Sequence, residues 1–215
     1  MGSGHLEPAD IPICPGRHPL NLEILATPAF IFLVITALGV LISRDWRLVI
    51  AFFAAQYFGV LILVALSWPF GLAGIKLVVG WMAGAALGTT QIGQKRAVLG
   101  NSWPASRVFR LLAAALAILL IYSISPEIVS WIPGLNLTVV RGGLTLMALG
   151  LFQLGMTARP FRVIIGLLTV LAGFEIMYAA VESSVLVAGL LAAINLGLAF
   201  LGSYFLSTAT PEELV

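Results

Sequence analysis

Two carboxylates lie in an apolar stretch near the C-terminal end of the chain. Glu175 falls far from either end of a hydrophobic run from about residue 163 to 181, and Glu182 follows seven residues later. Since residues two helical turns apart share a face, Glu182 and the intervening Tyr178 are expected on the same side as Glu175. A carboxyl group at membrane depth is costly unless paired, and it marks ion or proton pathways. The alternative is a structural, hydrogen-bonded glutamic acid that holds helices together.

Lys76 is a second charged residue within an apolar segment. It shares a stripe with Gly80, Gly84 and Gly88, and this small-xxx-small spacing lets a neighbouring helix approach closely. The stripe predicts that Lys76 faces protein, and the alternative is a side chain that snorkels to the outer headgroups. At 1.5 Å per residue, Lys76 and Glu175 lie at similar depths, roughly 10 Å from the outer ends of their helices. Similar depths favour an ion pair, in which the lysine would keep the carboxylate ionised.

Neutral polar side chains also occur at membrane depth. Two roles are open to Gln56, Gln153 and Asn195. One is to hold a water molecule in a proton path, and the other is to bridge helices by hydrogen bonds, which contributes about 1 kcal/mol. Tyr57 and Tyr178 are candidates for either network. The predicted proton or ion pathway comprises Glu175, Lys76, Glu182, Gln56, Asn195 and Tyr178.

The composition identifies an integral membrane protein. Of the 215 residues, 60% are hydrophobic and only 9% are charged, and the net charge of +2 comes from arginines between apolar segments rather than from a nucleic-acid-binding surface. The one cysteine, Cys14, excludes a disulfide framework and a four-cysteine metal site. No histidine lies in an apolar segment, and no metal-ligand cluster or phosphate-binding loop is present. We therefore expect no metal, no cofactor and no catalysis by this chain alone.

The elements that position these residues are apolar segments long enough to cross a membrane. Most reach the ~20 residues that a spanning helix needs. Seven such segments predict an all-α polytopic protein: 22–43, 48–68, 71–93, 108–124, 137–157, 163–182 and 184–206. The fourth is the weakest, because Arg107 and Arg110 open it and Pro126 ends it, and residues 127–135 look interfacial with Trp131 at headgroup level. An extended polar tail, 1–20, precedes the membrane domain, 21–208, and a short cytoplasmic tail, 209–215, follows it.

Charges between the segments predict the orientation. With the N-terminus outside, the outer side keeps Arg17 and Arg141. The inner connections then hold eight basic residues: Arg44, Arg47, Lys95, Arg96, Arg107, Arg110, Arg159 and Arg162. This positive-inside bias predicts an outer N-terminus, a cytoplasmic C-terminus and a multi-pass protein of the inner, cytoplasmic membrane.

Two triplets of helices share features. In each, a short basic turn, Arg44-Asp-Trp-Arg47 or Arg159-Pro-Phe-Arg162, precedes a helix with a polar residue at membrane depth, Gln56 or Glu175. Internal repeats are common in membrane transport folds. The pattern favours a 3+1+3 arrangement, with a first triplet over 22–93, a linking helix over 108–124 and a second triplet over 137–206.

The second triplet resembles the small K subunit of respiratory complex I and the C subunit of Mrp-type cation/proton antiporters. The resemblance lies in Thr157-Ala-Arg-Pro-Phe-Arg, Gly173-Phe-Glu-Ile-Met and Asn195-Leu-Gly-Leu-Ala-Phe-Leu, where Glu175 takes the place of the family's membrane glutamate. The whole chain is most similar to component E of hydrogenase-4 and formate-hydrogenlyase-type complexes, which is a longer relative of the K subunit. The first half of component E is matched by Arg47-Leu-Val-Ile-Ala-Phe-Phe-Ala-Ala-Gln56. The chain departs at Ala193, where complex I's subunit carries a second glutamate, and Arg162 lies about one turn further from Glu175.

This resemblance implies a membrane subunit of a complex-I-related redox complex that pumps protons or sodium ions. The implied partners are antiporter-like subunits, quinone- or hydrogenase-module subunits and lipids, without nucleic acid. The chain would then be a non-catalytic subunit of an oxidoreductase. A scaffold subunit without an ion path and a stand-alone transporter of a small substrate are the alternatives.

Overall fold

The computed structural model describes residues 19–92, 104–132, 134–182 and 184–208, and this part of the chain is all-helical. Its seven helices are each long and apolar enough to span a membrane, which confirms the predicted number. They are α1 (Pro19–Ile42), α2 (Trp46–Ala65), α3 (Phe70–Ile92), α4 (Pro104–Trp131), α5 (Leu137–Gly155), α6 (Pro160–Val181) and α7 (Val185–Thr208). α1 begins at Pro19, two residues inside the tail expected from the sequence.

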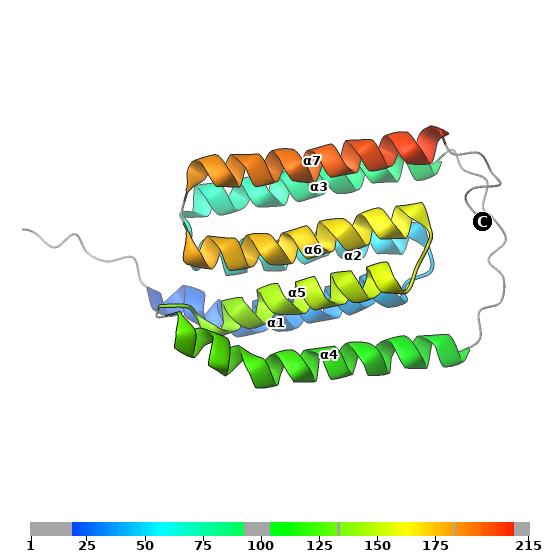
Figure 1. Cartoon of the computed structure of the whole chain (residues 1–215). Coiled ribbons are helices and arrows are strands. Elements are labelled where there is room, and N and C mark those ends of the chain that lie inside the picture. Colours follow the sequence, from blue (N-terminus) through cyan, green and yellow to red (C-terminus); the bar gives the residue numbers. More distant parts are fainter. Residues whose placement is uncertain (1–18, 93–103, 133, 183, 209–215) are drawn as a thin grey trace, which may run out of the picture.

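The helices run up and down in two layers (Figure 1). One layer holds α1, α2 and α3, and the other holds α4 to α7. α1 packs on α5, α2 on α6 and α3 on α7, while α4 lies at one edge against α5 and α1. Because the single helix α4 separates the two triplets along the chain, facing helices run in the same direction.

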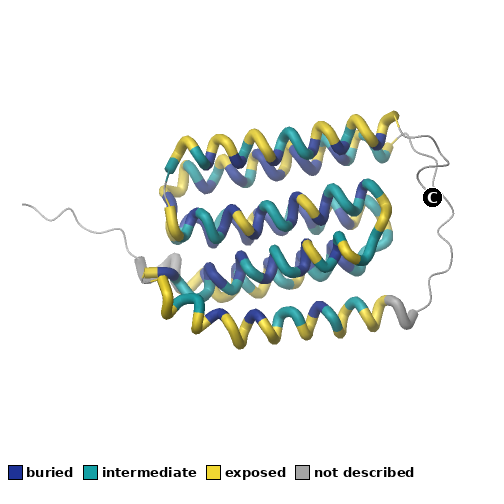
Figure 2. The backbone as a smooth tube through the Cα atoms, in the orientation of Figure 1, coloured by how far each residue is buried: buried dark blue, intermediate teal, exposed yellow. Residues whose placement is uncertain are grey.

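Burial follows this layering (Figure 2). Side chains between the layers, such as Phe53, Leu146 and Ile165, are fully buried. The outward faces carry large apolar side chains instead, and Leu119, Leu186 and Phe205 are each more than half exposed. An outer surface of this kind is suited to lipid rather than to water.

The fourth helix differs from the expectation that Pro126 ends it. α4 continues through Pro126 to Trp131, so residues 127–131 are its last turn and not a separate segment. The Ser125 hydroxyl donates to the carbonyl of Ile121 at this point. Hydroxyls that bond to backbone let a membrane helix tolerate proline, and the proline bends it, as Figure 1 shows near the end of α4.

One end of the bundle is basic. The turn between α1 and α2, the first turns of α4 and the turn between α5 and α6 meet there (Figure 1). The described arginines at this end are Arg44, Arg47, Arg107, Arg110, Arg159 and Arg162. Arg17, Lys95, Arg96 and the expected tail 209–215 lie outside the described residues. The assignment of this end to the cytoplasm stays a prediction.

Candidate functional site

Glycines on α5 and α6 fix the position of Glu175. A Cβ atom on Gly173 would lie 2.6 Å from the carbonyl oxygen of Gly143, and one on Gly150 would lie 2.9 Å from that of Gly166. The two glycines on each helix are seven residues apart, so they form a continuous stripe. The backbones touch only because these positions lack side chains. Glu175 follows Gly173 by two residues, and its side chain is directed toward α3 and α7.

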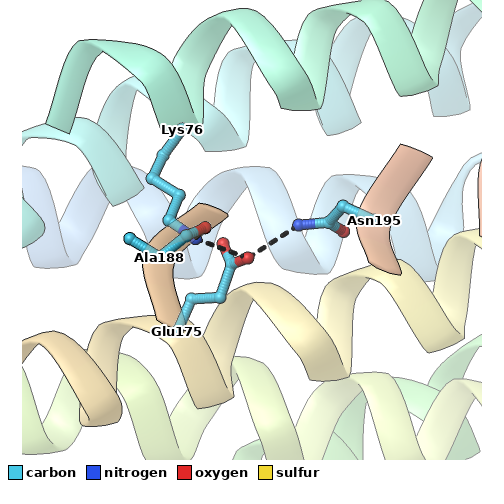
Figure 3. Close-up of polar contacts among 4 residues, drawn as sticks. All are labelled: Lys76, Glu175, Ala188 and Asn195. Carbon is cyan, nitrogen blue, oxygen red and sulfur yellow. Dashed lines mark hydrogen bonds and ion pairs between the residues drawn. The ribbon is translucent and has the colours of Figure 1, made fainter. Parts of the chain in front are cut away.

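Glu175 and Lys76 form a buried ion pair (Figure 3). Lys76 Nζ lies 2.8 Å from Glu175 Oε1, and the two side chains are 3% and 0% exposed. The same ammonium donates to the backbone oxygen of Ala188 at 3.4 Å. The predicted pairing is confirmed, and the snorkelling alternative for Lys76 is wrong, because its side chain turns into the bundle. The contacts join α3, α6 and α7.

Asn195 completes the contacts of Glu175. Its Nδ2 donates to Oε1 at 2.8 Å, so Lys76 and Asn195 share one carboxylate oxygen (Figure 3). Within the described part of the chain, the other oxygen, Oε2, and the Asn195 amide oxygen have no hydrogen-bond partner. Buried polar atoms are normally satisfied by protein or by ordered water. Oε2 is therefore the oxygen available to a proton or to a water molecule.

More polar groups are buried on α2, which packs on both α3 and α6. Gln56 and Tyr57 are fully buried, and neither the Gln56 amide nor the Tyr57 hydroxyl has a partner among the described residues. The Tyr57 ring packs edge-on against Phe53, with centroids 5.2 Å apart. Buried polar groups that lack a protein partner are normally satisfied by ordered water.

Other predicted pathway residues lie elsewhere. Glu182 caps α6 in an extended conformation and is exposed, because the helix ends at Val181. Its backbone oxygen accepts a hydrogen bond from Trp68 Nε1 at 3.0 Å. Tyr178 makes aromatic contacts with Trp68 and Phe174, each with centroids 6.4 Å apart. The structure thus groups Lys76 and Asn195 around Glu175 but not Glu182.

The remaining polar and small residues have packing contacts. Gln153 donates to the backbone oxygen of Arg162 at 2.9 Å and so bridges α5 and α6. The glycine stripe of α3 faces α2: a Cβ on Gly80 would collide with the Tyr57 ring, and one on Gly84 would meet Phe53 at 3.5 Å. A Cβ on Gly88 would lie 3.3 Å from Ile50.

The sequence interpretation missed the stripe on α5 and α6. Its signal is the seven-residue spacing of glycines in two consecutive segments, at positions 143 and 150 and at 166 and 173. Ala193, which the resemblance aligned with a second glutamate, is exposed on α7, whereas Asn195 is fully buried. The inward position on α7 is therefore that of Asn195.

Comparisons of the chain with protein-family models, curated proteins and solved structures found no match. Among the described residues, no group of three or more His, Cys, Asp or Glu side chains is placed to hold a metal ion.

Proposed function

We propose that this protein is a membrane subunit of a complex-I-related, redox-driven pump and that Glu175 contributes to its proton translocation. The carrying observation is the asymmetry of the carboxylate: Oε1 holds both Lys76 and Asn195, and Oε2 has no partner among the described residues. A proton that arrives on Oε2 neutralises Glu175 and leaves the Lys76 ammonium uncompensated. Proton occupancy is thereby coupled to the contacts of α3, α6 and α7.

The position of Lys76 favours protons over sodium ions. Its ammonium already lies 2.8 Å from the carboxylate, where a bound cation would otherwise be coordinated. The unpartnered groups of Gln56, Tyr57 and Asn195 would hold water near the pair and so supply a path for protons. Membership in a redox complex rests on the resemblance at Gly173-Phe-Glu-Ile-Met and Gly197-Leu-Ala.

A scaffold subunit is the second candidate, and the ion pair itself favours it. Lys76, Glu175 and Asn195 tie three helices together, and buried polar groups of this kind often specify one packing arrangement. In that case Glu175 would stay ionised and would not exchange protons.

Two measurements test the proposal. Affinity purification from the native membrane, with identification of co-purified subunits, should yield electron-transfer and antiporter-like partners. Recovery of the chain without large partners would indicate a stand-alone transporter. In the reconstituted complex, Glu175→Gln should abolish ion pumping coupled to electron transfer while the subunits stay together. The control is Glu182→Gln, which changes the exposed carboxylate at the C-terminal end of α6. Full pumping by Glu175→Gln would favour the scaffold.

A further inference from the structure

The basic end of the bundle brings together arginines from three separate segments. Arg44 lies in the turn between α1 and α2, Arg110 lies in α4, and Arg159 and Arg162 lie at the start of α6. Arg44, Arg110 and Arg162 are half-buried and Arg159 is exposed. These four residues are called the arginine cluster below.

Two members of the arginine cluster converge on the end of α1. Arg162 Nη2 donates to the backbone oxygen of Ser43, and Arg110 Nη1 donates to that of Leu41 at 3.5 Å. Arg44 directly follows Ser43 in the chain, and Arg159 lies about one helical turn before Arg162. Arg110 Nε is buried and has no partner among the described residues. Each guanidinium carries five N–H donors in a planar fork, so one backbone contact leaves donors available.

Arginines outnumber carboxylates among the described residues at this end of the bundle. Asp45 is the carboxylate that the structure describes at this end of the bundle. The helices α2 and α6 also begin here, and neither N-cap residue makes a side-chain cap hydrogen bond. Helix N-termini carry partial positive charge, so they add to the field of the arginines rather than offset it. An anion at this position would relieve the repulsion and accept the remaining hydrogen bonds.

We propose that the arginine cluster binds the phosphate group of an anionic phospholipid. Guanidinium groups match phosphate oxygens in a bidentate geometry, and basic pockets between membrane helices are suited to anionic headgroups. The lipid is favoured over free phosphate because the first turns of α4 expose apolar side chains beside Arg110. Val108, Phe109 and Leu112 are each more than half exposed and would contact the acyl chains. This inference is independent of the proton-translocation proposal.

The test compares lipids on the purified full-length chain. Phosphatidylglycerol and phosphatidylcholine with the same acyl chains are titrated in detergent, and bound lipid is counted by native mass spectrometry alongside the thermal midpoint. Phosphatidylglycerol should bind selectively and raise the midpoint, because a ligand of the folded state stabilises it. Arg159→Gln and Arg110→Gln should each weaken its binding by about fivefold. Arg159 is exposed, so its variant keeps the test valid if Arg110→Gln folds poorly.

The matched control is Arg47→Gln. Arg47 lies at the same end and its guanidinium lies over the Trp46 ring, with 5.3 Å to the centroid, outside the arginine cluster. Its loss should leave phosphatidylglycerol binding unchanged. An equal loss in Arg47→Gln and Arg159→Gln would overturn the site in favour of a diffuse surface charge. Equal binding of phosphatidylglycerol and phosphatidylcholine would also overturn the proposed site. If inorganic phosphate alone raised the thermal midpoint as much as phosphatidylglycerol does, the proposal of a lipid ligand would be wrong.

Discussion

Lys76 and Glu175 depend on each other for stability, since each is buried and each is the other's counter-charge. Removing one partner of a buried pair typically costs about 3–5 kcal/mol, because the other charge stays without compensation. Lys76→Met and Glu175→Gln should therefore each lower the free energy of unfolding, and the double variant should lose less than the sum. Chemical denaturation of the purified variants measures this. Additive losses would mean that the two side chains are not coupled.

Substitution of Tyr57 distinguishes a role in a proton path from a role in helix packing. Its hydroxyl is fully buried and without a partner among the described residues, whereas its ring fills the space beside Gly80. Tyr57→Phe keeps the ring, so the thermal midpoint should stay within a few degrees or rise, because a buried unsatisfied hydroxyl costs about 1–3 kcal/mol. Pumping in the reconstituted complex should slow if the hydroxyl holds water beside Glu175. Tyr178→Phe, with its ring in an aromatic contact, is the control and should change neither quantity.

Among the elements, α5 and α6 form the pair whose contact places Glu175. Gly173→Ala would bring a methyl group to 2.6 Å from the Gly143 carbonyl oxygen and 2.7 Å from the Met147 backbone nitrogen. Backbone atoms cannot move aside individually, so the helices must separate, at a cost of roughly 1–3 kcal/mol or more. We expect a lower folded yield and a lower thermal midpoint for this variant.

Gly197→Ala is the matched control for that substitution. Gly197 lies in α7, and a Cβ there would meet nothing within 4 Å. Alanine also favours helix by about 1 kcal/mol over glycine, so this variant should be as stable as the original chain or more so. A Gly173→Ala protein with an unchanged thermal midpoint would show that α5 and α6 are not held at this distance.

Element by element, the sequence predicted the spans better than their ends. Seven apolar stretches of sufficient length identify the helices because a helix satisfies its backbone hydrogen bonds within the segment itself. Proline lacks an N–H group, so Pro126 predicts a helix end, but the helix continues past it, and Ser125 bonds to the carbonyl of Ile121 there. Glu182 follows Glu175 by two helical turns, which predicts that both lie on one face, but the helix ends one residue before Glu182.

At the scale of the whole molecule, the site depends on both triplets. Tyr57 and Lys76 come from the first layer, and Glu175 and Asn195 come from the second (Figure 1). Depth along each helix is readable from sequence, because every residue adds 1.5 Å. The similar depths of Lys76 and Glu175 correctly predict that the two residues form a pair. Which helix faces which is not readable in this way, because several arrangements of seven apolar helices bury similar surfaces. The packing of α3 on α7 and α2 on α6 is the information that the structure adds.

The orientation of the whole molecule follows from its charged ends and can be measured directly. In a Cys14→Ser background, single cysteines are placed by Lys95→Cys, Arg159→Cys and Glu182→Cys. Positions 95 and 159 lie in basic segments that are predicted to be cytoplasmic, whereas Glu182 is exposed at the opposite end of α6 from Arg159. A membrane-impermeant maleimide added to intact cells should label position 182 alone, and permeabilised cells should show labelling at all three. Labelling of position 95 or 159 in intact cells would show that the orientation is the reverse of the predicted one and that the arginine cluster lies on the outer surface.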